Sequence, residues 1–172
     1  MYIPTERLQL KPITRDSLDI LTELLCDETV TRTYMVPDFA CPTEAMPLAE
    51  RLMALSESDD RLVAGIYAGT ELIGILNETE SNAESIELGY ALLPRYCNRG
   101  YATEALRGAI GHCFARGFRE VRAGAFEENL PSIRVMVKCG MKKLPLTEEI
   151  PYRGTPHTCV YYSITKEDFH AI

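Results

Sequence analysis

Residues 97–102, CNRGYA, have the composition of an anion-binding loop at the start of a helix. The N–H groups at a helix N-terminus have no intrahelical partner, and the macrodipole places about half a positive charge there, so phosphate groups bind well. Gly100 removes a Cβ that would block a pyrophosphate, and Ala102 keeps the next exposed position small. Asn98 and Arg99 add polar donors. The loop therefore predicts a phosphate site, although a plain strand-to-helix turn would have the same pattern.

Three β-rich runs precede this loop and position it. Residues 61–68 and 71–78 are separated by a Gly-Thr pair, which predicts a tight hairpin, and residues 85–93 follow after a polar turn. Together these runs predict an antiparallel meander. Pro94 ends the third strand, because proline has no N–H to donate to a ladder.

The remaining elements alternate between strands and helices. The spacing of apolar residues predicts, in chain order, a strand over 7–12, a helix over 14–26, a helix from about 43, a helix from 102 that ends at Gly117, a strand over 121–125, a helix between Asn129 and Gly140, and a strand over 159–165. This order predicts a mixed α/β sheet. Residues 27–45 and 142–158 are expected to be substrate loops.

Composition argues against several classes of function. Of 172 residues, 18 are basic and 25 acidic, a formal charge of −7, and no stretch gathers lysine and arginine into a stripe, so nucleic acid is not an expected partner. No apolar run approaches the roughly 18 residues of a transmembrane helix. The N-terminus lacks the basic start and apolar centre of a signal peptide, so we expect a cytoplasmic protein with no membrane partner. The six cysteines and three histidines form no metal-ligand spacing, so no metal is expected.

Four stretches resemble a known family. Residues 97–102 resemble motif A of the GNAT superfamily of N-acetyltransferases, Q/R-x-x-G-x-G/A. Residues 5–16 (TERLQLKPITRD), 86–94 (IELGYALLP) and 129–141 (NLPSIRVMVKCGM) resemble the branch of RimJ/RimL-like ribosomal-protein N-terminal acetyltransferases. The resemblance covers nearly the whole chain in the right order. It implies a single GNAT domain over residues 1–172, with an α/β (α+β) acyl-CoA N-acyltransferase fold: a mixed, mostly antiparallel central sheet of six to seven strands flanked by helices on both faces.

The same resemblance implies which residues hold acetyl-CoA. The cofactor-binding residues would be Ala91, Leu92, Leu93, Cys97, Asn98, Arg99, Gly100, Tyr101, Ala102 and Asn129. In this family the cosubstrate lies where two central strands splay apart, with its pyrophosphate on the helix that starts near Gly100. Its pantetheine arm would pair with the backbone of residues 91–93, where an N–H would polarise the thioester carbonyl. Asn129 would bond the pantetheine arm, cap its helix, or do both.

Glu87 and Ser132 are the candidate catalytic residues. The attacking amine must be neutral, and an α-amino group, with a pKa of about 7.7–8.0, loses its proton more easily than a lysine-like ammonium near ~10.4. Glu87 could accept this proton through water, or be a cross-strand charge on a solvated sheet face. By resemblance, Ser132 would hydrogen-bond the leaving sulfur, unless it only caps its helix. Tyr90 could line the cleft or pack; Arg134 and Lys138 could approach the adenosine phosphate or be solvated.

The chain departs from the family pattern in motif A, before the last strand and at Met141, which stands where the motif of residues 129–141 has phenylalanine. Cys97 stands where motif A has glutamine or arginine, so a side chain that helps to hold the pyrophosphate is missing; Arg95 or Arg99 could replace it. His157 and Thr158 stand where relatives often carry an aspartate before the last strand. Any substrate contact at that position is therefore in doubt.

The function implied is transfer of the acetyl group of acetyl-CoA directly to a primary amine in a ternary complex. The acceptor would be a peptide N-terminus or a small molecule, and the protein a monomer or homodimer. A CoA-binding sensor or scaffold with the same fold, and a generic phosphate-binding module, are the alternatives from other functional classes.

Overall fold

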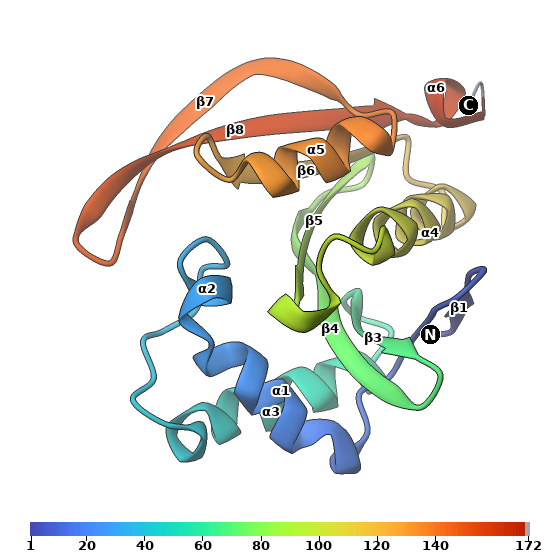
Figure 1. Ribbon diagram of the computed structural model, residues 1–172. Helices are drawn as coiled ribbons and strands as arrows, with labels where there is room; N and C mark the ends of the chain where they lie inside the picture. The colour runs from blue at the N-terminus through green and yellow to red at the C-terminus, as the bar shows by residue number, and fades with distance from the viewer. Residues whose placement is uncertain (171–172) are drawn as a thin grey trace.

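Eight strands form one sheet in the computed structural model, which describes residues 1–170 (Figure 1). The strands are β1 (Ile3–Pro4), β2 (Gln9–Lys11), β3 (Val63–Ala68), β4 (Glu71–Ser81), β5 (Ser85–Leu92), β6 (Glu120–Phe126), β7 (Lys142–Tyr152) and β8 (Thr155–Thr165). Their order across the sheet is β1-β2-β3-β4-β5-β6-β8-β7. Every neighbouring pair is antiparallel except β5 and β6, which are parallel. This confirms the mixed, mostly antiparallel sheet predicted from the sequence.

The described sheet has more strands than the six to seven expected, because two of them leave no clear sequence pattern. β1 spans two residues, which are too few for an alternation to show. β7 covers most of residues 142–158, where we expect a substrate loop from the sequence. Its side chains are exposed or half-exposed along its whole length, so no buried face marks it as a strand; pairing with β8 holds it in place. The loop prediction for this segment is wrong.

Six helices and two single 3-10 turns connect the described strands. The helices are α1 (Leu18–Cys26), α2 (Glu28–Thr31), α3 (Pro42–Glu57), α4 (Tyr101–Ala115), α5 (Leu130–Lys138) and α6 (Lys166–His170). The 3-10 turns, Arg15–Ser17 and Pro94–Tyr96, precede α1 and α4. Because the first of these turns intervenes, α1 begins at Leu18 rather than directly after Thr14. Within residues 1–170, no helix combines the length and the apolarity needed to cross a membrane.

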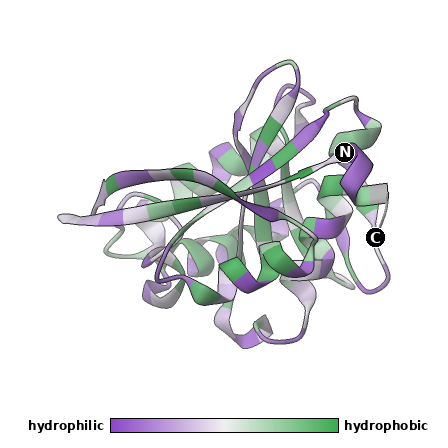
Figure 2. Cartoon of the chain, turned by 90° about the horizontal axis from the view of Figure 1, so that it is seen from above, coloured by the Kyte–Doolittle hydropathy of each residue, from purple (hydrophilic) through white to green (hydrophobic). Residues whose placement is uncertain are grey.

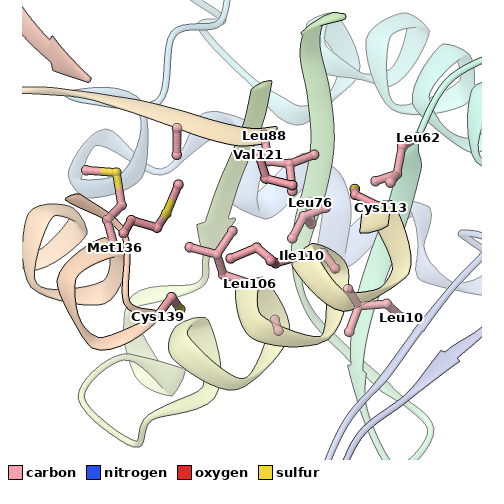
Figure 3. Close-up of a cluster of buried hydrophobic side chains, with 14 of the residues drawn as sticks. Leu10, Leu62, Leu76, Leu88, Leu106, Ile110, Cys113, Val121, Met136 and Cys139 are labelled. Atoms are coloured by element: carbon pink, nitrogen blue, oxygen red, sulfur yellow. The ribbon is translucent and has the colours of Figure 1, made fainter. Parts of the chain in front are cut away.

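Helices cover both faces of the sheet, and the two largest of the three buried hydrophobic clusters that the described residues form lie on opposite faces. On β3, Ala64 and Ile66 belong to a cluster shared with α4 and α5, whereas Val63 and Tyr67 belong to a cluster shared with α1 and α3. Figure 3 shows part of the first cluster, where Ile110 of α4 lies among strand side chains. In Figure 2 the helices carry hydrophobic and hydrophilic stretches side by side, as helices with one buried face do.

The parallel pair β5 and β6 separates part-way along its length. Pairing begins at Ser85 and ends at Glu87, which lies opposite Arg122. Beyond this point β5 continues to Leu92 and β6 to Phe126 while each remains paired with its other neighbour. The two strands therefore leave a wedge between them, and backbone groups along the wedge edge of β5 lack a strand partner.

Candidate active site

A cleft of about 1040 Å³ occupies the wedge between β5 and β6. One set of its walls comes from residues 97–103 and from Asn129 with α5; we call this part the loop half. The other set comes from residues 29–35, from Asn77, Thr79, Glu87 and Glu128, and from β8; we call this part the hairpin half, because β8 and β7 form one long hairpin (Figure 1). One continuous cleft thus joins a loop before a helix to a set of polar side chains.

The residues predicted for the site line this cleft with two exceptions. Lining residues are Glu87, Ala91, Leu92, Cys97, Asn98, Gly100, Tyr101, Ala102, Asn129 and Ser132. Leu93 lies outside the lining because it is fully buried and its N–H already donates to the carbonyl of Ile73 (3.0 Å). Arg99 lies outside it too, with its guanidinium 5.9 Å from the ring centroid of Tyr96. Of residues 91–93, the first two therefore remain available to a ligand.

Gly100 takes the left-handed conformation at the N-cap of α4, with a φ of 81°. Residues with a Cβ rarely adopt this conformation, so the turn itself requires glycine. A Cβ added there would also approach Nη2 of Arg7 to 3.3 Å. Asn98 has a positive φ of 61°, which asparagine tolerates better than most residues. These turns lead the chain straight into α4, and residues 101–103 of its first turn line the cleft.

Arg7 braces this loop from the connection between β1 and β2, although no sequence pattern marks that role. Its Nη1 donates to the carbonyl of Arg99 (3.0 Å), and its guanidinium lies 4.7 Å from the ring centroid of Tyr101. Its Nε and its backbone N–H each donate to the Glu104 carboxylate at 2.7 Å. Burial favours the neutral form of Glu104, but bonds from Thr5 and Arg7 outweigh it and hold the pKa of this carboxyl below its usual value. The negative charge in the first turn of α4 is therefore paired.

The first turn of α5 separates the roles of two polar residues. Asn129 is the N-cap, because its Oδ1 accepts a hydrogen bond from the N–H of Ser132 (3.3 Å). The Ser132 hydroxyl lies instead 2.9 Å from the Tyr90 hydroxyl across the cleft. Asn129 thus supplies the cap, and the hydroxyl of Ser132 lies beside the cleft, where it can contact a ligand.

Glu87 is half-buried at the point where the wedge opens. Burial raises the pKa of this carboxyl, and the nearby Glu80 and Glu148 act in the same direction, against a hydrogen bond from Thr79 Oγ1 (2.8 Å). A carboxylate with a raised pKa binds a proton more readily at neutral pH, which suits a general base.

The sequence relatives agree with this geometry. A family model for the acetyltransferase (GNAT) domain matches residues 7–142. The chain belongs to the GNAT acetyltransferase family. It is similar to the N-acetyltransferase YoaA of Bacillus subtilis (strain 168), with 26% identity over 170 residues that cover 95% of this chain and 96% of the relative. This GNAT protein is therefore an acetyl-CoA-dependent N-acetyltransferase, as the resemblance implies.

Solved GNAT structures show the same fold. A GNAT acetyltransferase from Bacillus anthracis superposes with a TM-score of 0.84 at 23% identity, covering 97% of this chain and 99% of that one. A RimL ribosomal alpha-N-protein acetyltransferase in complex with coenzyme A superposes with a TM-score of 0.83 at 17% identity, covering 96% and 98%. The predicted α+β GNAT fold and its likeness to RimL are confirmed.

The loop half presents the backbone N–H groups of the first turn of α4, and the side chains of Arg134 and Lys138 of α5 also line it. The Cys97 thiol donates to the carbonyl of Leu93 (3.8 Å), and burial raises its pKa, so the thiol stays neutral. Arg95 pairs with Glu23 of α1 (2.5 Å). Neither the Arg95 nor the Arg99 side chain lines the cleft, so neither stands in for the residue that Cys97 replaces.

The hairpin half contains a histidine–carboxylate pair that the sequence does not predict. His157 Nδ1 donates to Glu128 Oε1 (2.6 Å), and the imidazole stacks on Phe126 with ring centroids 4.3 Å apart. The bond from its own N–H and the bond from His157 hold the pKa of Glu128 below its usual value, so this carboxylate accepts and Nδ1 carries the proton. Nearby, Tyr161 donates to Glu148 of β7. The sequence pointed to this region through the departure at position 157 and through the substrate segment expected over residues 142–158, but it did not predict the pairing of His157 with Glu128.

Tyr152, close to the hairpin tip, ties the hairpin to the segment around α2. Its hydroxyl donates to the carbonyl of Thr31 (2.6 Å) and accepts from the N–H of Val36 (3.4 Å). Arg153 pairs with Asp38 beside it (3.0 Å). Figure 1 shows the hairpin tip reaching down toward α2. Two segments expected to be substrate loops, one of them a hairpin instead, thus meet at the cleft.

Proposed function

We propose that this GNAT protein transfers an acetyl group from acetyl-CoA directly to a primary amine while both substrates are bound. The observation that carries this proposal is the wedge itself: pairing of β5 and β6 stops at Glu87, and the resulting cleft runs from the Gly100 loop to Glu87 and β8. A single domain over residues 1–172, acting in the cytoplasm as a monomer or homodimer and without nucleic acid, is part of the proposal.

The loop half would hold the cosubstrate. The N–H groups of residues 101–103, behind Gly100, would bind the pyrophosphate, and the paired charge of Glu104 would not repel it. Along a strand, successive backbone groups point to opposite edges, and the N–H of Leu93 points to β4. The N–H of Leu92 would therefore face the wedge, where it can bond the pantetheine arm, with Ala91 shaping the wall. Asn129 would bond the same arm through its remaining amide donors.

Glu87 and Ser132 would then have separate roles in the transfer. Bound acetyl-CoA supplies the thioester whose acetyl group is transferred. Glu87 takes a proton from the acceptor ammonium through water, so that the neutral amine can attack the carbonyl carbon. As the carbon–sulfur bond breaks, the hydroxyl of Ser132 donates a hydrogen bond to the departing sulfur. The proton that the nitrogen loses as it becomes an amide passes to this sulfur, which leaves as a thiol. No covalent bond to the enzyme forms, so none of the cysteines is needed as a nucleophile.

The charge of the hairpin half favours a cationic acceptor. Three carboxylates surround it, those of Glu87, Glu128 and Glu148, whereas Arg32 is the basic residue that lines this half beside His157. An ammonium group would gain from these charges, and a carboxylate next to the amine would be repelled.

The direct test is turnover with a matched acceptor panel. Purified protein and acetyl-CoA are mixed with butylamine, 1,4-diaminobutane, 4-aminobutanoate, amino sugars and short peptides with free N-termini, and both free thiol and acetylated product are measured. We expect thiol release that depends on the acceptor, with 4-aminobutanoate the poorest of the three four-carbon amines. Thermal stabilisation by acetyl-CoA without turnover on any member would leave the sensor alternative and reject the transfer.

The ternary-complex mechanism has its own readout. After incubation with acetyl-CoA alone, the intact mass of the protein should remain unchanged. A stoichiometric gain of one acetyl group that an amine then discharges would instead indicate a covalent intermediate and reject direct transfer.

A further inference from the structure

Tyr90 spans the wedge at the point where β5 has left β6. It lies three residues beyond the last paired residue, Glu87, and its hydroxyl reaches Ser132 in the first turn of α5. The two hydroxyl oxygens are 2.9 Å apart, and the Tyr90 oxygen is 3.2 Å from the carbonyl oxygen of Ser132. Both residues line the cleft. A hydrogen bond thus links β5 to the first turn of α5 beside the cleft.

This contact decides where the Ser132 proton can point. A tyrosine hydroxyl has one proton to donate. If Tyr90 donates to the Ser132 hydroxyl oxygen, the serine keeps its own O–H free to point into the cleft. If Tyr90 donates to the Ser132 carbonyl, the serine can donate back to the tyrosine oxygen, and no donor remains for a ligand. The backbone of Ser132 is also held, because its N–H donates to Asn129. Asn129 and Tyr90 together fix the position of the serine.

The tyrosine keeps its proton throughout this arrangement. Burial raises the pKa of Tyr90 well above its usual value, and the hydrogen bond with Ser132 offsets only part of that effect. Tyr90 therefore does not transfer a proton, and its hydroxyl can donate a hydrogen bond. The Ser132 hydroxyl oxygen, at 2.9 Å, is the nearer acceptor, since the Ser132 carbonyl oxygen is 3.2 Å away. Packing against the core cluster shared with α4 and α5 fixes the ring.

We infer that Tyr90 is a positioning residue: it donates to the Ser132 hydroxyl oxygen and so aims the serine O–H at the sulfur that leaves during acetyl transfer. This inference rests on the proposed role of Ser132. It assigns Tyr90 a task beyond packing, which its position on a half-buried strand would otherwise explain.

The test uses Tyr90→Phe, Ser132→Ala, the double variant, and Tyr67→Phe as a matched control. Tyr67 is also a buried sheet tyrosine whose hydroxyl is bonded, to Ser17, but it lies in the cluster shared with α1 and α3. The first readout is the pKa of the CoA thiol in its complex with each protein, followed by ultraviolet absorbance of the thiolate. The second is kcat and the KM for acetyl-CoA with an acceptor that the wild-type protein acetylates.

We expect the CoA thiol to have its lowest pKa in the wild-type and Tyr67→Phe complexes, because an aimed donor stabilises the thiolate. Tyr90→Phe should raise this pKa and lower kcat about tenfold, with KM for acetyl-CoA within about twofold of wild type. In the Ser132→Ala background, removing the Tyr90 hydroxyl should add nothing.

Each opposite result overturns the inference. An unchanged thiol pKa in Tyr90→Phe, or an equal loss of kcat with and without Ser132, would show that the tyrosine only packs. The thiol titration needs no acceptor, so it decides the role of Tyr90 even if the protein acetylates no amine. A lack of acetylation would reject the proposed transfer and not the role of Tyr90.

Discussion

The two halves of the cleft are built in opposite ways. The loop half comes largely from one short run of sequence, residues 97–103, whose shape follows from Gly100 and from the helix behind it. The hairpin half is assembled from residues 29–35, from β4 and β5, and from β8, which meet only after the whole sheet has formed. The shape of the loop half is encoded locally and can be predicted from sequence, whereas the hairpin half, our proposed acceptor site, depends on long-range contacts.

The largest expected effect tests the loop half. Gly100→Glu should weaken acetyl-CoA binding by about 100-fold or more, because it places bulk and negative charge where the phosphate N–H groups converge. Calorimetry with acetyl-CoA measures the loss. Gly117→Glu is the matched control, since Gly117 also has a positive φ, 104°, and no neighbouring side chain or backbone lies within 4 Å of the point where a Cβ would stand. It also places a side chain at a positive φ, so equal losses in both variants would remove the anion site from Gly100.

Substitution of Glu87 tests whether the carboxylate between the loop half and the hairpin half acts as the general base. Glu87→Gln should lower kcat about 100-fold and remove the acidic limb of the pH–rate profile, while acetyl-CoA binding changes little. Glu57→Gln is the control, because Glu57 is exposed at the end of α3 and lies outside the cleft lining. If both variants keep wild-type kcat, Glu87 is only a charge on the sheet.

The same variant has a stability readout with a defined sign. Because the folded-state pKa of Glu87 is raised, folding stability is lost as pH rises from the unfolded-state pKa through the folded one. Glu87→Gln should therefore raise the melting temperature at pH 7 and leave it nearly unchanged at a pH below the unfolded-state pKa. Loss of stability at pH 7 would contradict the raised pKa.

Arg7 is the residue distant in sequence on which the shape of the loop half depends. Arg7→Ala should weaken acetyl-CoA binding about tenfold, because the Arg99 carbonyl loses its donor and the Glu104 charge is left unpaired beside the phosphate site. Adding Glu104→Gln should recover part of the affinity. Arg119→Ala, which breaks an exposed ion pair with Glu84, is the control. No change in affinity for Arg7→Ala would mean that the loop holds its shape alone.

These contacts explain what could and could not be predicted from the sequence. The strand, loop and helix around Gly100 follow from local patterns, and so does the cap at Asn129. The bond from Arg7 to Glu104 joins residues 97 apart in sequence, and the bond between Tyr90 and Ser132 joins residues 42 apart. No periodicity encodes such pairs.

β7 was missed for a different physical reason. β7 is an edge strand whose side chains are exposed on both faces, so its sequence has no apolar alternation. Its backbone pairing with β8 within the hairpin holds it in the sheet. The same hairpin brings His157 to Glu128 and Tyr152 to α2. Because β7 was predicted as a loop, these contacts of the hairpin half could not be predicted either.

The smallest expected effect tests whether that hairpin shapes the acceptor site. Tyr152→Phe removes one hydroxyl that bonds the carbonyl of Thr31 and the N–H of Val36. We expect the KM for the acceptor to rise about threefold while acetyl-CoA affinity stays constant, because these hydrogen bonds, of about 0.5–1.5 kcal/mol each, fix a wall of the hairpin half only. Tyr2→Phe, at an exposed tyrosine outside the cleft lining, is the control. A change in acetyl-CoA affinity instead would mean that the two halves are coupled through the sheet, and that the division between a locally encoded and a long-range half does not hold in function.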